Sequence, residues 1–122
     1  MRLVIKGDPK AKKNSQQVII AGGRHRVIPS PAYRDYHRMA LMQITGRYRQ
    51  QISFPVNVRC VYYMKTRRIV DLVNLLEATC DILKDASVIE DDNSRIVVSH
   101  DGSRVAHDPY NPRVEIEITE VD

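Results

Sequence analysis

The stretch from residue 71 to residue 92 is rich in acidic side chains that could hold a metal ion. Its candidate residues are Asp71, Asn74, Glu77, Asp81, Asp91 and Asp92. Hard divalent cations prefer oxygen ligands, and Mg²⁺ is commonly held by one or two carboxylates while water and phosphate complete its shell. Such an ion stabilises charge on a scissile phosphate and can supply hydroxide near neutral pH. The residue types therefore suit phosphodiester hydrolysis with Mg²⁺, or with Mn²⁺ as a substitute.

Helical spacing would bring part of this set onto one face. Asn74, Glu77 and Asp81 stand at positions i, i+3 and i+7 of a predicted helix. Asp71 begins that helix, and the acidic pair at 91–92 follows its end after a short turn. A purely structural account also exists, in which Asp71 caps the helix, the helical acids are solvated and the pair forms a turn. The pattern alone leaves both explanations open.

Charge is divided unevenly along the chain, although the net charge is only +4. Residues 1–70 hold fifteen Lys and Arg side chains against two acids, whereas residues 71–92 hold seven acids against Lys84 alone. A basic body favours a polyanion through phosphate contacts and counterion release. An acidic cluster inside it opposes such binding unless a divalent cation neutralises the acids. This combination is expected of a nuclease.

Turn signals and hydrophobic periodicity predict the elements that would position these residues. The expected strands cover residues 2–6, 56–64, 94–99 and 113–120, with a hairpin over residues 15–28 and helices that begin at Pro31 and Asp71. Ser30 before Pro31 is typical of a helix start. The order β-ββ-α-β-α-β-β predicts an α+β fold of two layers, a mixed β-sheet under two main helices, in a single domain over residues 1–122.

Composition indicates a cytoplasmic protein with no membrane partner. No apolar run approaches the ~18 residues that a membrane span needs. Cys60 and Cys80 fall inside a predicted strand and a predicted helix, where free cysteines usually behave as small buried apolar side chains. Their spacing matches no zinc site.

One continuous stretch carries a family resemblance. It reads Arg67-Arg68-Ile69-Val70-Asp71-Leu72-Val73-Asn74-Leu75-Leu76-Glu77 and runs through Asp81-Ile82-Leu83 to Val88-Ile89-Glu90-Asp91-Asp92. A basic stretch before an Asp-x-Asp-Asn motif, an Asp within the helix and a later Asp pair resemble the RusA family of Holliday-junction resolvases. Weaker similarity reaches the closing strand at 115–119. The resemblance implies a Mg²⁺-dependent, homodimeric DNA endonuclease with a prophage or phage role in recombination and repair.

The resemblance also implies roles for single residues. Asp71 and Asp92 correspond to catalytic, metal-binding carboxylates of the family. Asp91 is a matched neighbour that could join them as a metal ligand, and Asn74 and Asp81 would support the site.

Two positions depart from the family pattern. The second Asp of the motif is Val73, and the family's catalytic Lys falls on Glu77. The chain could therefore be a relative that binds branched DNA without cutting it. Alternatively, Glu77 supplies the missing catalytic, metal-binding carboxylate, and Lys65 or Lys84 takes the role of the lysine. We favour compensation because it keeps the number of carboxylates constant.

Basic residues near the acidic cluster are candidates for phosphate contact. Arg67 and Arg68 shortly precede Asp71, and a guanidinium matches the geometry of phosphate. The early lysines could equally be a solvated loop. The predicted DNA contacts are Lys10, Lys12, Lys13, Asn14, Lys65, Arg67 and Arg68. His100 could carry a proton, but a surface turn is the favoured explanation for it, and one of Tyr62 and Tyr63 is expected in the core.

Three functions compete. The first is a structure-selective endonuclease that cuts a four-way junction as a homodimer, because paired nicks need two sites related by two-fold symmetry. The hairpin at 15–28 or the first helix would contribute to the interface. The second is a protein that binds branched DNA without cutting. RNA binding is disfavoured, because aromatic residues are only 6% of the chain and RNA-binding modules stack bases on such residues.

Overall fold

The computed structural model describes residues 1–12 and 16–122, and over 16–21 and 25–27 it describes the backbone alone. The strands are β1 (Arg2–Lys6), β2 (Gln16–Ala21), β3 (Arg24–Pro29), β4 (Val56–Met64), β5 (Val97–Ser99), β6 (Arg104–His107) and β7 (Arg113–Glu120). The helices are α1 (Pro31–Gln43) and α2 (Leu72–Asp85), with a short 3₁₀ turn, η1 (Gly46–Tyr48). This is the predicted α+β fold.

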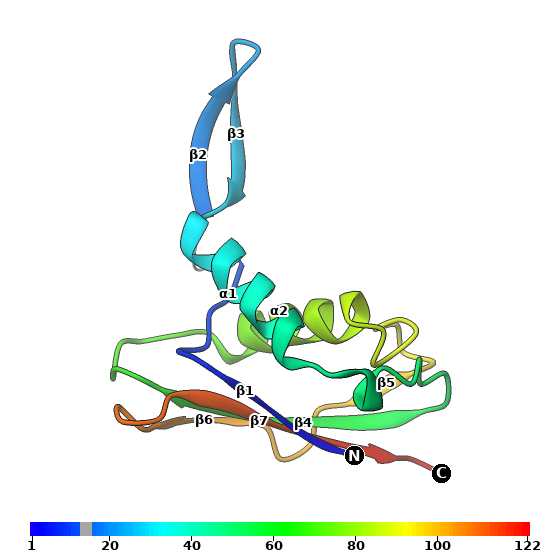
Figure 1. Ribbon diagram of the computed structural model, residues 1–122. Helices are drawn as coiled ribbons and strands as arrows, with labels where there is room; N and C mark the ends of the chain where they lie inside the picture. Colours follow the sequence, from blue (N-terminus) through cyan, green and yellow to red (C-terminus); the bar gives the residue numbers. More distant parts are fainter. Residues whose placement is uncertain (13–15) are drawn as a thin grey trace.

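A mixed sheet and two helices form two layers (Figure 1). The sheet runs β1-β7-β4-β5, and β6 pairs with the far half of β4. β7 is antiparallel to β1 and β4, whereas β5 and β6 are parallel to β4. The chain therefore passes from β4 through α2 back to the same sheet as a crossover unit. The hairpin of β2 and β3 extends from the beginning of α1, away from the sheet (Figure 1).

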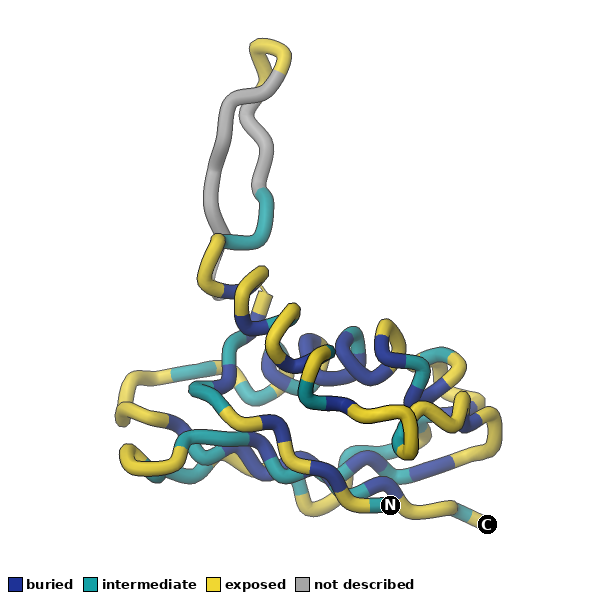
Figure 2. The backbone as a smooth tube through the Cα atoms, in the orientation of Figure 1, coloured by how far each residue is buried: buried dark blue, intermediate teal, exposed yellow. Residues whose placement is uncertain are grey.

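The core lies between the sheet and the helices (Figure 2). Alternate residues of β4 are buried, with Tyr62 the largest of them, and Val61 on the opposite face is buried as well. The Tyr62 hydroxyl lies 2.6 Å from Thr79 Oγ1, which also donates to the Leu75 carbonyl at 3.0 Å. Because a buried polar group without a partner costs stability, this pair keeps α2 in a fixed register on β4.

Both helices begin with the predicted caps. Ser30 Oγ accepts the Tyr33 N–H at 3.2 Å, and Asp71 Oδ1 accepts the Val73 N–H at 2.9 Å. Within α2, Leu75 and Leu83 are buried as expected, whereas Leu72 and Leu76 are only half-buried. Among the described residues, no helix combines the length and apolarity of a membrane span.

Two strand predictions need correction. The strand expected over residues 94–99 covers only Val97–Ser99, because Asn93 winds the preceding residues into a turn. The Asn93 carbonyl accepts N–H groups from Ile96 and Val97, and its side chain accepts that of Arg95. In addition, β6, a four-residue strand that pairs with the end of β4, was not predicted from the sequence.

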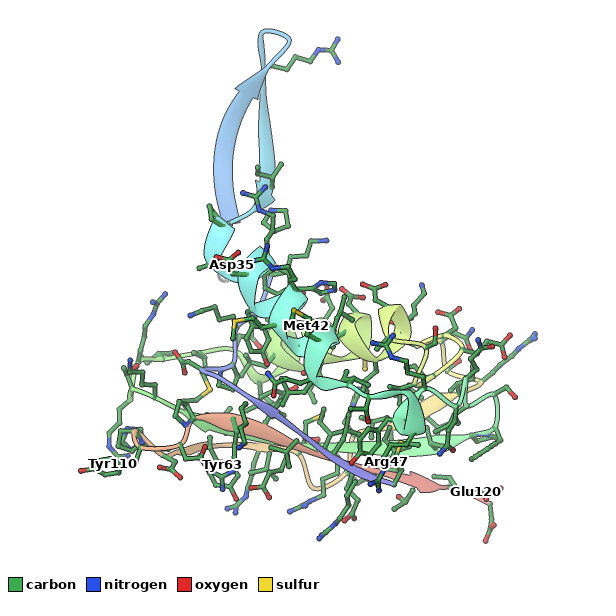
Figure 3. All side chains as sticks on the ribbon, in the orientation of Figure 1. Asp35, Met42, Arg47, Tyr63, Tyr110 and Glu120 are labelled. Atoms are coloured by element: carbon green, nitrogen blue, oxygen red, sulfur yellow. The ribbon has the colours of Figure 1, made fainter. Side chains whose placement is uncertain are left out.

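Two arginines on the strands of the sheet pair with glutamates of β7. Arg2 Nε lies 2.6 Å from Glu117 Oε2, and Arg113 lies 2.8 Å from Glu115. Tyr63 lies on the sheet, where Figure 3 labels it, and the Arg113 guanidinium covers its ring, 3.9 Å from the centroid. Because Tyr63 is covered, it does not offer a free ring for base stacking.

Candidate functional site

Asp71 lies at the point where the loop after β4 enters α2. It is exposed, and one of its oxygens caps the helix. The cap engages only Oδ1, and the second carboxylate oxygen lies at the N-terminal end of α2, where the helix dipole favours negative charge. Capping and a further ligand role are therefore compatible in Asp71.

Asp91 organises the turn after α2. Its carboxylate accepts the Asp92 N–H at 2.8 Å and the Asn93 side-chain amide at 3.0 Å, and it lies 3.4 Å from Lys84 Nζ. These hydrogen bonds, led by that from the Asp92 backbone, lower the pKa of Asp91. Because both of its oxygens are engaged, Asp91 holds the turn in shape and leaves the exposed Asp92 as the better ligand candidate.

Asp81 links this turn to the rest of the acidic cluster. It is half-buried, and burial followed by the nearby charge of Asp92 raises its pKa, while Lys12 acts in the opposite direction. Charges on the helix, on the turn and on the basic segment after β1 therefore all act on Asp81, and Lys12 lines the same cleft. The sequence predicted only a supporting role for this residue, because the influence of Asp92 on it depends on the tertiary fold.

The carboxylates are spread along α2. Asp81 lies ten residues after Asp71 in the chain, or roughly 15 Å further along the helix axis at ~1.5 Å per residue. Among the described residues, no three His, Cys, Asp or Glu side chains form a group that could hold a metal ion as they stand. The assignment of Asp71, Glu77, Asp91 and Asp92 as metal ligands thus stays a prediction.

Glu77 and Val73 occupy the two positions that depart from the expected motif. Glu77 is exposed on α2, and its charge acts on Asp81 and on Tyr33 of α1. Val73, one turn earlier, is 68% exposed although it is apolar. A side chain at position 73 therefore points into solvent beside Asp71, where a carboxylate would be tolerated sterically. Asn74 is half-buried next to it.

The predicted basic residues come from two segments that are tied together. The Lys65 N–H donates to Asp8 Oδ1 at 2.9 Å, and Lys10 Nζ lies 3.9 Å from Asp8 Oδ2. Lys65, Arg67 and Arg68 are exposed on the loop that leads to Asp71, and Lys12 is exposed as well. The predicted contacts Lys13 and Asn14 lie outside the described residues.

A cleft between the two helices was not foreseen. It has a volume of about 400 Å³ and is lined by Lys12, Pro29, Tyr33, Arg34, His37, Asp81 and Asp85. His37 Nε2 lies 2.8 Å from Asp85 Oδ2, and burial together with the nearby carboxylates raises the pKa of Tyr33 to about 12. The four-residue spacing of Tyr33 and His37 was the only sequence signal of a shared helix face.

His100 has a structural position. Its Nδ1 lies 2.8 Å from the Val58 carbonyl, and its Nε2 lies 3.9 Å from Cys80 Sγ. The turn expected after it is present, closed by a hydrogen bond from the Ser103 N–H to the His100 carbonyl. The ring joins β4, α2 and this turn, in agreement with the favoured explanation for His100.

Comparison with protein families decides the class. The family model described as Endodeoxyribonuclease RusA matches residues 6–119. The chain belongs to the RusA family. The match runs from the last residue of β1 to the penultimate residue of β7 and so includes Asp71, Asp91 and Asp92. RusA proteins are endodeoxyribonucleases that generally use a divalent metal. A search of curated proteins finds no match for this chain.

Proposed function

We propose that this RusA protein is a Mg²⁺-dependent, structure-selective endonuclease that resolves Holliday junctions and other branched DNA. The main support is that Lys84 of α2 lies 3.4 Å from Asp91 of the following turn, while Lys12 of the basic segment lines the same cleft as Asp81. Carboxylates alone would repel DNA, whereas Lys and Arg side chains alone would bind DNA without cleaving it. Their juxtaposition suits a cation-dependent reaction at a phosphate.

The donor set fits a hard cation. Asp71, Asp92 and Glu77 offer exposed carboxylate oxygens, the ligands that Mg²⁺ prefers, and one or two of them suffice when phosphate and water complete the shell. When bound, the ion would supply a Lewis acid for the scissile phosphate and lower the pKa of water. Lys84, held 3.4 Å from Asp91, is better placed than Lys65 to take the role of the family's lysine.

DNA is expected on the helix side of the molecule. The sheet's open face pairs Arg2 and Arg113 with glutamates. The loop of Lys65, Arg67 and Arg68 is exposed and leads directly to Asp71. A duplex that contacts this loop would therefore bring its backbone to the carboxylates, with Lys10 and Lys12 on the adjacent segment.

A purified protein tests this activity directly. Incubation with a synthetic four-way junction and Mg²⁺ is expected to give paired nicks on a denaturing gel and linear duplex products on a native gel, and EDTA should prevent both. A linear duplex of the same sequence is the matched substrate and should stay intact. Tight junction binding without nicking in Mg²⁺ or Mn²⁺ would instead identify a non-cleaving relative, the alternative that Val73 and Glu77 raise.

We expect the active species to be a homodimer. The hairpin of β2 and β3 extends away from the sheet and helices, so it is available to a second copy (Figure 1). At the other end of α1, Met39 and Met42 are 55% and 77% exposed. Light scattering at micromolar protein should give twice the mass of the 14.0 kDa chain. A monomeric mass would remove the symmetry on which paired nicking depends.

A further inference from the structure

A cavity beside Asp71 has no role in the proposed chemistry. Its volume is about 240 Å³, and it lies between the segment after β1, the loop after β4 and the first turn of α2. Val70, on its wall, directly precedes Asp71. A ligand in this cavity would therefore sit next to the candidate catalytic carboxylate.

The lining combines an apolar floor with a polar rim. The floor includes Pro9, Met64 and Leu75, all buried. The rim includes Lys10 and Arg68, which are cations, and it also carries Asp8 and Thr66. The apolar floor offers a phosphate no hydrogen bonds, and the Asp8 carboxylate would repel it. A flat ring with apolar faces and a polar edge matches both parts of the lining.

The Asp8 carboxylate can accept a hydrogen bond from a ligand in the cavity. It is one of only two acids among the first seventy residues, within a strongly basic part of the chain. Its Oδ1 accepts the Lys65 N–H at 2.9 Å, which fixes the side chain. Its Oδ2 lies 3.9 Å from Lys10 Nζ, beyond hydrogen-bonding distance, so this oxygen keeps the capacity to accept a proton donor.

Resting on the proposed function, we infer that this cavity binds one unpaired nucleobase of branched DNA. The Asp8 carboxylate accepts a hydrogen bond from an amino group on the base, as acidic side chains do with exposed base edges. Lys10 and Arg68 contact the flanking phosphates. The cavity is smaller than the roughly 300–1,000 Å³ of pockets for drug-sized ligands, which suits a single base rather than a whole nucleotide.

This assignment explains selectivity for branched DNA. Taking a base from an intact duplex costs its pairing and stacking, whereas a base that is already unpaired or unstacked costs much less. The base pairs that flank a branch point can lack a stacking neighbour on one side, so opening one of them costs less than opening a pair within a linear duplex. The cavity therefore favours junctions and places the neighbouring phosphodiester beside Asp71.

The test uses a four-way junction that carries 2-aminopurine at the branch point, with EDTA present so that the DNA stays intact. The fluorescence of 2-aminopurine rises when the base leaves the stack. Val70→Phe fills the cavity, and Thr66→Phe fills it from the exposed rim if the first variant does not fold. Val105→Phe is the matched control, because Val105 is 40% exposed on β6 and does not line the cavity.

Wild-type protein and Val105→Phe are expected to raise the fluorescence and to bind the junction more tightly than a matched duplex. A cavity-filling variant should lose the rise and bind the junction roughly tenfold more weakly, because the base no longer buries its faces on the apolar floor. Asp8→Asn, which can still accept the Lys65 N–H, should abolish any preference for amino-bearing bases over thymine at the branch point.

Two results would overturn the inference. If the folded cavity-filling variant raises the fluorescence and binds as Val105→Phe does, no base enters the cavity, while the proposed endonuclease function stands. If the wild-type protein binds the junction no better than duplex, structure selectivity itself is absent, and both proposals fail.

Discussion

Replacing Asp92 with Asn is expected to abolish junction cleavage while junction binding stays at, or above, wild-type strength. The Asp92 side chain is exposed at the turn that Asp91 holds in place, and its charge acts on Asp81. Amidation removes a hard anionic ligand, and a bound metal supplies several kcal/mol of transition-state stabilisation. The rate should therefore fall on the order of a thousandfold. Binding should be preserved because the change removes negative charge that faces phosphate.

The measurement is single-turnover cleavage of a labelled junction, with binding followed separately in EDTA. Asp101→Asn is the matched control, because Asp101 is exposed on the turn between β5 and β6 and is expected to leave both quantities unchanged. Asp71→Asn should behave as Asp92→Asn does. Asn caps helices as well as Asp, so the start of α2 is retained. Cleavage by Asp92→Asn at the wild-type rate would remove this turn from the catalytic site.

Local signals predicted the frame of the site, because each acts over only a few residues. Ser30 and Asp71 cap the helices through bonds to N–H groups two or three positions away. The alternation in β4 likewise depends only on which face of the strand each side chain occupies. Features of this kind can be predicted from neighbouring residues alone.

Contacts between distant segments were not predictable in the same way. The closeness of Asp81 and Asp92 depends on how the turn after α2 folds back. The bond from Lys65 to Asp8 joins residues far apart in the chain, and nothing near either residue marks it. β6 was missed because its four residues form a strand only by pairing with the end of β4.

Glu77→Gln separates the two explanations of the altered motif. If Glu77 replaces the carboxylate missing at Val73, the substitution should eliminate cleavage and leave junction binding intact. Glu120→Gln, an equally conservative change at an exposed residue of β7, should have no effect on either. If Glu77→Gln cleaves at the wild-type rate, Glu77 is a solvated helix residue and the site rests on Asp71, Asp91 and Asp92.

A second substitution tests why Glu77→Gln is expected to lose cleavage. Glu77 lies six residues after Asp71, roughly 9 Å along the axis at ~1.5 Å per residue. It must therefore lean toward the helix N-terminus, the direction that helical side chains take. Val73 lies nearer to Asp71 and is 68% exposed, so an Asp fits there without disturbing the core. Adding Val73→Asp to the Glu77→Gln variant is expected to restore cleavage, if the reaction needs a carboxylate on this face of α2.

The double variant Val73→Asp/Glu77→Lys restores both features of the family motif at once. Under compensation it should cleave about as well as the wild-type protein, because the number of carboxylates near Asp71 is unchanged. The opposite result is that the double variant cleaves, whereas the wild-type protein binds junctions without cleaving them. This result would show that the wild-type chain has kept the DNA-binding surface and lost the catalytic activity. The comparison is decisive because positions 73 and 77 are both exposed on α2. Changes in rate then report the chemistry of the side chains rather than the stability of the fold.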